Sequence, residues 1–253
     1  PEVAEQLMQG GVVPFFGLDE ALEAVEAAAR VGAPDPDPVL LPGLAEADVI
    51  LSEAGAKTEL EGFGVPVPRF FEADSPEAAG RLAAGLQGPL ALKGVGLAHK
   101  SDHGAVRLGL AAADVARAAA EIGTDRFLIE EMAAGGVAEL LVGVTRDPAH
   151  GFVLTLGAGG VLTELLADTV SLLIPSRRKG VKQALKQLKC TPLLAGYRGK
   201  PGADMGAILD VVDAVQAYVV ANADTVSEVE INPLICTPKG AIAVDALIRK
   251  AKS

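Results

Sequence analysis

The sequence predicts an α/β or α+β protein, and three observations lead to this class. Half of the 253 residues are apolar, aromatic residues make up 4%, and tryptophan is absent. Alanine, valine, leucine and glycine dominate, which suits close packing of helices on a sheet. Apolar runs of strand length are interspersed with stretches whose apolar residues recur at helical spacing. A chain of this length and apolar content can form one large domain or two ordinary ones.

The first 38 residues are predicted to be separate from the rest. Residues 11–16 (Gly-Val-Val-Pro-Phe-Phe) are predicted to form a short strand, and residues 20–31 a helix capped by Asp19. Proline and aspartate alternate in residues 33–38, which indicates an extended linker. We expect residues 1–38 to be the tail of an upstream domain plus this linker, in a chain that is a fragment of something longer. The alternative is that the tail packs on the following domain as its edge.

Short helices and strands are predicted for the stretch that follows the linker. Residues 65–71 are expected to form a strand at a sheet edge, because two of its positions are prolines, which cannot donate ladder hydrogen bonds. The other elements expected here are helices at 52–62, from Ser75 onward and at 114–122, and strands at 89–92 and 106–110.

The second half is predicted to carry the longer elements. Residues 204–220 form the longest predicted helix, with apolar residues at helical spacing from Ile208 to Val219. Strands at 226–231 and 241–244 are joined across the turn sequence Thr-Pro-Lys-Gly at 237–240. The remaining elements expected are strands at 127–130, 139–144 and 152–156, and a helix at about 179–188.

The segment 92–106 is the most informative candidate for a binding site. Lys93 stands at the end of an apolar run, and a polar loop with His99 and His103 leads to a second apolar run. Such a hairpin can lay cationic groups and backbone N–H groups over a polyphosphate. Lys93 can instead lay its stem on apolar surface and keep its ammonium in water. Histidine chemistry alone leaves nucleophilic, structural and exposed roles open for both histidines.

Acidic and amide side chains near the C-terminus supply a candidate magnesium site. Glu230 and Asn232 lie on one face of a predicted strand, since strand side chains alternate, and Asp245 can come from the adjacent strand. Carboxylate and amide oxygens suit Mg²⁺. Considered alone, Asn232 is better explained as a satisfied side chain at a strand end, and Asp245 as a surface residue. With the hairpin at 92–106, however, they indicate a site for a metal-bound nucleoside triphosphate.

A glycine cluster follows the predicted strand at 152–156. Gly157, Gly159 and Gly160 can let the backbone approach phosphates closely, because they carry no side chain. Glycine clusters more often form turns, so this signal is weak without the others.

Charge and cysteine content exclude several classes of function. A formal net charge of −11 argues against non-specific nucleic-acid binding and against docking on anionic membranes. Cys190 and Cys236 give neither a zinc pattern nor a disulfide framework, so we expect a reducing, cytoplasmic environment. The sequence has no apolar run of about 18 residues and shows no secretory signal.

Taken in order, these motifs resemble the ATP-grasp part of the NDP-forming acyl-CoA synthetases, which are related to succinyl-CoA synthetase β subunits. The resemblance runs from about residue 51 to residue 248. The residues that carry it are 64–68 (Gly-Val-Pro-Val-Pro), Lys93, 99–106, 139–144, 157–160, Glu164, Asp168, 194–199 (Leu-Ala-Gly-Tyr-Arg-Gly), 230–234 (Glu-Ile-Asn-Pro-Leu) and Asp245. A single motif would be weak, but their common order is specific.

The resemblance implies nucleotide contacts for several residues. Lys93 would contact the ATP phosphates, Glu130 or Glu131 would lie near the adenine, and Glu139 near the ribose. Together with the glycines at 157–160 they form the predicted cofactor-binding set.

The resemblance also implies metal and catalytic roles. Asn232 and Asp245 would hold Mg²⁺. His99 matches a histidine proposed to carry a phosphoryl group in some members, and Glu230, on the strand face of Asn232, is the second catalytic candidate.

The implied fold is an ATP-grasp fold, with two lobes and the nucleotide bound between them. We expect an ATP-grasp domain at 39–253, with a small lobe at about 65–126 and a large lobe at about 127–253. The implied reaction converts ATP, a carboxylate and CoA into ADP, phosphate and acyl-CoA through an acyl phosphate and a phosphohistidine. The implied partner is a CoA-ligase or CoA-binding domain, upstream in the same chain or in a separate subunit of an oligomer, and residues 1–32 resemble its end.

Two other functions fit parts of the pattern. The first is a degenerate module that senses nucleotide in a fused protein acetyltransferase. It is favoured by Leu172, which stands where the family has an arginine, although Arg177 or Arg178 can substitute. The second is an ATP-grasp carboxylate–amine ligase, which would act without CoA and would give no role to His99. The intact set of Lys93 and the two metal candidates favours the synthetase.

Overall fold

The computed structural model describes residues 2–11, 13–15, 17–30, 39–43, 49–96, 105–160 and 168–251. The chain divides into two units, Pro1–Pro38 and Val39–Ser253. The first unit contains α1 (Glu2–Gln9) and α2 (Leu18–Arg30). Apolar side chains on α2 are exposed, and Leu22 and Val25 show 57% and 65% of their surface.

The strand predicted at 11–16 is wrong. Residues 13–15 have no strand conformation, and α1 precedes them where no helix was expected. A strand is stabilised by hydrogen bonds to a neighbouring strand. The described residues of this unit offer only helices, so the apolar run at 13–15 has no strand to pair with.

All the strand pairings described in the second unit are antiparallel, and they form two sheets. The larger sheet has seven strands in the order β1-β11-β9-β6-β7-β8, with β10 paired to β9. Its strands are β1 (Val49–Ile50), β6 (Ala138–Asp147), β7 (Gly151–Ala158), β8 (Thr169–Leu173), β9 (Val226–Thr237), β10 (Gly240–Ala243) and β11 (Ala246–Lys250). The predicted hairpin near the C-terminus is confirmed by β9 and β10.

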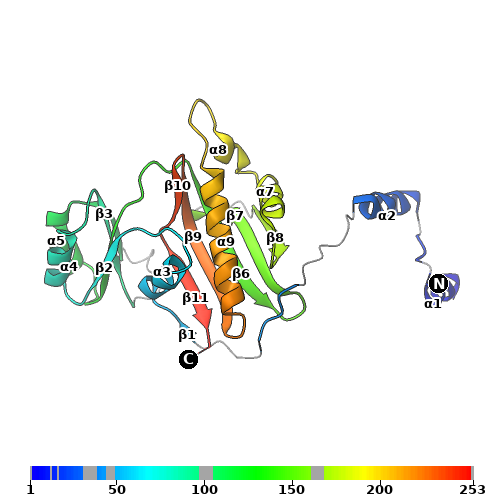
Figure 1. Ribbon diagram of the computed structural model, residues 1–253, viewed down its shortest axis with the longest axis horizontal. Helices are drawn as coiled ribbons and strands as arrows, with labels where there is room; N and C mark the ends of the chain where they lie inside the picture. Colours follow the sequence, from blue (N-terminus) through cyan, green and yellow to red (C-terminus); the bar gives the residue numbers. More distant parts are fainter. Residues whose placement is uncertain are drawn as a thin grey trace. The chain divides into compact units, whose positions relative to one another are not determined.

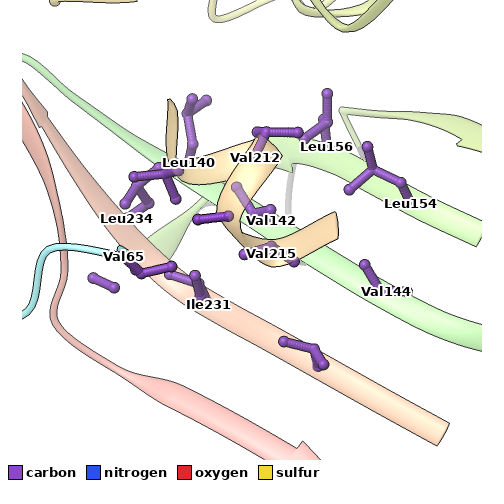
Figure 2. Packing of buried hydrophobic residues seen from close by; sticks show 14 of the residues in the cluster. Val65, Leu140, Val142, Val144, Leu154, Leu156, Val212, Val215, Ile231 and Leu234 are labelled. Carbon is purple, nitrogen blue, oxygen red and sulfur yellow. The ribbon is translucent and has the colours of Figure 1, made fainter. Parts of the chain in front are cut away.

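The long helix predicted at 204–220 is confirmed as α9 (Met205–Ala221). Asp204 caps it, accepting a hydrogen bond from the Ala207 N–H at 3.1 Å. α9 runs across the strands of the large sheet (Figure 1). Figure 2 shows Val212 and Val215 of α9 over apolar side chains of β6, β7 and β9, in the larger of the two cores. Among the described residues, no helix combines the length and apolar character needed to cross a membrane.

Three shorter helices belong to the same lobe: α3 (Glu53–Glu61), α7 (Arg178–Leu185) and α8 (Thr191–Ala195). The helix predicted at 52–62 is confirmed as α3. The Ser52 hydroxyl accepts a hydrogen bond from the Gly55 N–H at its start, and Gly62 ends it.

The smaller sheet has four strands in the order β2-β5-β3-β4. They are β2 (Phe70–Ala73), β3 (Leu90–Gly94), β4 (Val106–Leu110) and β5 (Phe127–Glu131), with the helical segments α4 (Pro76–Ala83), η1 (Ala112–Asp114) and α5 (Val115–Ala120). α4 and α5 lie side by side against this sheet (Figure 1). The predicted hairpin around Lys93 is confirmed, because β3 and β4 pair directly.

Two segments near the predicted lobe boundaries of 65 and 126 pair differently from expectation. β5 (Phe127–Glu131), expected at the start of the large lobe, pairs with β2 and β3 of the small sheet. The predicted strand at 65–71 begins only at Phe70. Val65 is buried in the larger core, and the Pro66 carbonyl accepts a hydrogen bond from the Ala243 N–H of β10 at 2.9 Å. The prolines therefore hold this segment against the large sheet.

Candidate functional site

A cavity of about 680 Å³ lies where the small sheet meets the large one. Both lobes line it, with apolar side chains from β3 and β4 and charged side chains from α3, β5 and the bend after β10. The lining residues are Glu53, Ala91, Lys93, Val106, Leu108, Glu130, Glu131, Met132, Ala133, Glu139, Pro233, Ile235, Val244 and Asp245. Five residues predicted from the sequence as cofactor or metal contacts, namely Lys93, Glu130, Glu131, Glu139 and Asp245, are therefore brought together here.

Lys93 lies at the inner wall of this cavity and is 8% exposed. Its Nζ lies 2.5 Å from Glu53 Oε1, 2.7 Å from Glu130 Oε1 and 2.8 Å from the Val244 carbonyl oxygen. These contacts rule out the alternative of a lysine with its ammonium in water. The ammonium is instead fixed at the wall of the cavity.

Lys57 completes a ring of four alternating charges. Its Nζ lies 2.9 Å from Glu53 Oε1 and 2.5 Å from Glu130 Oε2, so each carboxylate contacts both lysines. Lys57 has no exposed surface, and Glu53 and Glu130 are 9% and 2% exposed. Two buried positive charges thus balance two buried negative ones, which is the arrangement that buried ions require.

The ring stabilises the charged forms of its members. Burial by itself raises the pKa of Glu53, but the charges and hydrogen bonds of Lys93 and Lys57 outweigh it and lower the pKa to about 2. Burial likewise acts to lower the pKa of Lys93, whereas Glu53, Glu130 and Asp245 raise it above its ordinary range. Lys93 therefore presents a permanent positive charge at the cavity wall.

The two glutamates at the end of β5 differ in their contacts. Glu130 belongs to the charge ring, while a Glu131 carboxylate oxygen accepts a hydrogen bond from the Gln87 N–H at 2.8 Å. Sequence reasoning left open which of them lies beside a base. Glu131 is the less buried of the two and is free of the ring, so it is the better placed.

Asp245 lines the cavity, and Asn232 lies next to it without being one of the lining residues. The Asn232 N–H donates to the Asp245 carbonyl oxygen at 3.3 Å, and Asn232 Oδ1 accepts a hydrogen bond from the Gly160 N–H at 2.9 Å. Asp245 lies in the bend between β10 and β11 instead of in the predicted strand. The described part of the chain has no group of three or more His, Cys, Asp or Glu side chains placed to hold a metal. One carboxylate and one amide fit an Mg²⁺ ion that also takes phosphate oxygens and water as ligands.

The glycines at 157–160 lie where neighbouring backbone and side chains approach closely. A side chain on Gly157 would meet Thr169 at 2.8 Å, and one on Gly159 would meet the Leu140 backbone at 2.5 Å. The Gly159 N–H donates to the Glu139 carbonyl oxygen at 2.9 Å. These glycines do not line the cavity, and they let the backbone at the end of β7 approach its neighbours; their role in phosphate binding stays a prediction.

Gly160 also serves the site only indirectly. It has φ +66°, and a side chain there would collide with the Glu139 carboxylate at 1.8 Å. Its N–H is taken by Asn232. Gly160 therefore holds the Asn232 amide through its N–H and leaves room for the Glu139 carboxylate.

Glu230 does not line the cavity, in contrast to its predicted catalytic role. It lies within β9, opposite Gly143 of β6 and Leu247 of β11, and is half-buried. It shares a strand face with Asn232, but neighbouring strands flank it on both sides. His99 and Glu164 lie outside the described residues.

Two other residues of the sequence motifs have structural roles. The Asp168 carboxylate accepts hydrogen bonds from the N–H groups of Lys189 and Cys190 at 2.9 and 3.1 Å. The Arg178 guanidinium is paired with Asp210 and Asp213 of α9. Arg178 therefore does not replace the arginine that is missing at Leu172.

Sequence reasoning missed Glu53 and Lys57. The available signal was their spacing of four residues on α3, together with Ala56 and Leu60, which are buried on the same helix. Charged residues that flank apolar positions of a short helix are usually exposed, so only the contacts with Lys93 and Glu130 identify them as part of the site.

Comparison with protein families agrees with this geometry. Residues 43–249 match the family model of the ATP-grasp domain. The chain is 31% identical, over 221 residues, to the β subunit of ADP-forming acetate–CoA ligase II from Pyrococcus furiosus, and the match covers 81% of this chain and 93% of that subunit. It is 32% identical, over 269 residues, to a trans-feruloyl-CoA synthase from an unknown prokaryotic organism. That match covers 98% of this chain but 38% of the synthase, so the chain spans less than half of that relative.

Solved structures show the same similarity. The dinucleotide-forming acetyl-coenzyme A synthetase 1 of Ca. Korarchaeum cryptofilum, in complex with coenzyme A and Ca-AMPCP, is 31% identical, with a TM-score of 0.73 over 79% of this chain and 93% of that chain. A further structure of that synthetase, with coenzyme A and Mg-AMPPCP, is 31% identical, with a TM-score of 0.70 over 79% of this chain and 92% of that chain. Its phosphohistidine segment points towards the nucleotide-binding site of that protein.

Proposed function

We propose, because the chain belongs to the ATP-grasp family and to its branch of ADP-forming acyl-CoA synthetases, that it is the ATP-binding and phosphoryl-transfer part of such an enzyme. The complete reaction would convert ATP, a carboxylate and CoA into ADP, phosphate and acyl-CoA. The nucleotide-sensing alternative has no support among the relatives, which are named as ligases and synthases.

The observation that carries the proposal is the cavity between the two sheets. It is apolar on the side of β3 and β4, and its charged lining consists of Lys93 and the carboxylates of Glu53, Glu130, Glu131, Glu139 and Asp245. A nucleotide likewise has an apolar part and a charged part, since its base is flat and apolar and its phosphates are anionic. The base would lie among side chains such as Val106, Leu108 and Ile235, with Glu131 and Met132 at its edge.

Lys93 would face the phosphates. It is the lysine of the charge ring that lines the cavity, whereas Lys57 has no exposed surface. The negative charge that develops on phosphoryl oxygens during transfer is stabilised by cations held close to them. Glu139, at the end of the cavity near Gly160, would lie near the ribose.

Asp245 and Asn232 would hold Mg²⁺ against the phosphates. When bound, the ion would neutralise phosphate charge and orient the terminal phosphoryl group. Asp245 supplies the carboxylate and Asn232 the amide oxygen. The Gly160 N–H keeps that amide oriented through its 2.9 Å hydrogen bond.

His99 is proposed as the residue that receives the phosphoryl group. A neutral imidazole nitrogen would form the new P–N bond as the bond to ADP breaks. The P–N bond would then break as a carboxylate oxygen of the substrate, at the partner domain, takes the phosphoryl group to form the acyl phosphate. The proposal for His99 is supported by the sequence resemblance. His99→Ala, tested in a protein that contains the partner domain, should abolish acyl-CoA formation and spare ATP binding.

The proposed partner is a CoA-binding domain, and the proposed location is the cytoplasm. We expect the chain to bind Mg-ATP and to form no acyl-CoA by itself from short carboxylates. Adding the CoA-binding part, as a fusion or as a separate protein, should start ADP release coupled to thioester formation. Robust thioester formation by the isolated chain would contradict the proposal that the CoA-binding part is needed for that step. The absence of any nucleotide binding would contradict the proposed function itself.

A further inference from the structure

The contacts of Lys93 leave its ammonium with no N–H to offer. An ammonium has three N–H donors. Glu53, Glu130 and the Val244 carbonyl oxygen lie at 2.5, 2.7 and 2.8 Å from its Nζ. A direct hydrogen bond to a phosphate oxygen therefore requires Lys93 to give up one of these three contacts.

Giving up a carboxylate has a consequence inside the protein. Glu53 and Glu130 are almost fully buried, and a buried charge that loses its partner is strongly destabilising. Lys57 contacts both of them, Glu53 at Oε1 and Glu130 at Oε2. It can therefore keep each carboxylate paired when Lys93 turns toward a ligand.

We propose that Lys57 is a positioning residue for the nucleotide, which holds Glu53 and Glu130 in place and neutralised while Lys93 exchanges one contact for a phosphate oxygen. This inference rests on the proposed function, because it requires Lys93 to face phosphates. Lys57 is too deeply buried to touch the nucleotide and acts only through the two glutamates.

The inference predicts how ATP affinity changes with the net charge of the ring. Two lysines and two glutamates sum to zero in the native ring. Removing the charge of Lys57 leaves a net charge of −1 in the ring beside the phosphates, with Lys93 as the one lysine of the ring that contacts the two carboxylates. Neutralising Glu53 as well returns the ring to one lysine and one glutamate, with a sum of zero.

A role confined to stability is the competing explanation. Lys57 lies on α3, whose Ala56 and Leu60 belong to the large core, whereas Lys93 and Glu130 lie on strands of the small sheet. The ring therefore also ties the two lobes together. The two explanations differ in what the loss of Lys57 does to ligands with different numbers of phosphates.

The experiment measures binding of ATP, ADP, AMP and adenosine, each with Mg²⁺, to the 253-residue chain by calorimetry. In Lys57→Met the Kd for Mg-ATP should rise about tenfold, because a unit charge is lost near the phosphates. The loss should shrink as phosphates are removed and should be absent for adenosine. An unchanged Kd for Mg-ATP, or an equal loss for adenosine, would overturn the inference.

Two further variants separate positioning from folding. Lys250→Met is the matched control, since Lys250 pairs with Glu59 of the same helix at 2.5 Å and lies away from the cavity. It should lower the melting temperature and leave the Kd for ATP unchanged. The double variant Lys57→Met/Glu53→Gln should recover the affinity to within about threefold of the native chain; no recovery would contradict the charge argument.

If Lys57→Met does not fold, the inference is tested by comparing the ATP affinity of the double variant with that of Glu53→Gln. In Glu53→Gln, Glu130 still contacts both lysines, whereas in the double variant it contacts only Lys93 of the two. The double variant should therefore bind ATP more weakly than Glu53→Gln. Equal affinities would overturn the inference. A native chain that binds no Mg-ATP would instead contradict the proposed function itself.

Discussion

The two faces of the large sheet are built from alternate residues of the same strands, yet they serve different purposes. On β9, Val229 and Ile231 are completely buried in the core that α9 covers, whereas Glu230 and Asn232 are half-buried on the opposite face. Figure 2 shows the apolar side chains of β6, β7 and β9 that gather on the covered face. Stability and ligand binding therefore depend on different residues of the same strands.

The charge ring is the exception to this separation. Glu53 and Lys57 lie on α3, which contributes Ala56 and Leu60 to the same core as α9. Changes in the ring should therefore affect both stability and binding. A change on the covered face alone should affect stability, and a change on the polar face alone should affect binding.

Leu154→Ala tests the covered face and should have the largest effect on stability. Leu154 has no exposed surface and lies on β7 in the larger core (Figure 2). Its truncation should lower the free energy of unfolding by about 3 kcal/mol, because a cavity remains. Thermal unfolding should shift down by about 6–12 °C. A change in the Kd for Mg-ATP beyond about twofold would break the separation of the two faces.

The pH dependence of stability tests the ring. The charges of Lys93 and Lys57 outweigh burial and lower the pKa of Glu53 from 4.5 to about 2. A carboxyl with a lower pKa in the folded state contributes stability that is complete above its unfolded pKa and is lost as the pH falls toward the folded value. The contribution should be of order 3 kcal/mol and should disappear between about pH 4.5 and pH 2.

Glu53→Gln should remove this part of the acid sensitivity. The free energy of unfolding, measured by chemical denaturation across that pH range, should fall less steeply in the variant than in the native chain. Identical slopes would show that Glu53 is not held ionised by the two lysines.

Asp245→Ala tests the polar face. The variant should bind Mg-ATP about 10–100-fold more weakly, because a charged ligand of the ion is lost, and should melt within a few degrees of the native chain. The control is Asp210→Ala, which removes an exposed carboxylate paired with Arg178 on α9 and should leave binding unchanged. An unaltered magnesium dependence of ATP binding in Asp245→Ala would remove Asp245 from the metal site.

Tyr218→Phe should have the smallest effect. The Tyr218 hydroxyl donates to Glu59 Oε2 at 2.6 Å, and Lys250 contacts the other oxygen of that carboxylate. The loss of one hydrogen bond, with its acceptor still paired, should lower the free energy of unfolding by about 1 kcal/mol. ATP affinity should not change, since this contact joins α9 to α3 outside the cavity; a weaker affinity would show that α3 transmits strain to the ring.

Local signals made much of the fold predictable. Ser52, Ser75 and Asp204 cap helices where the sequence predicted helix starts, because capping depends on residues three positions apart. The β3–β4 and β9–β10 hairpins join neighbouring segments of the chain. β8 and β11 were missed, since their strand conformation comes from pairing with β7 and β9 and not from a distinctive pattern of their own.

The candidate site was predictable only in part. Lys93 and Asp245 were found because their residue types carry the expected chemistry at the ends of apolar runs. The ring was not, because Glu130 is 73 positions from Lys57 in the sequence. The packing role of Gly159 was missed for the same reason: a side chain there would strike the backbone of Leu140, a contact that only the folded sheet defines.

The most direct test of the account is calorimetric titration of Mg-ATP into the native chain and into Lys93→Met. The account predicts binding by the native chain, at least about tenfold weaker binding of ATP by the variant, and equal binding of adenosine by both. Equal affinities of the two proteins for Mg-ATP would contradict the central claim that the cavity between the sheets holds the nucleotide with its phosphates at Lys93.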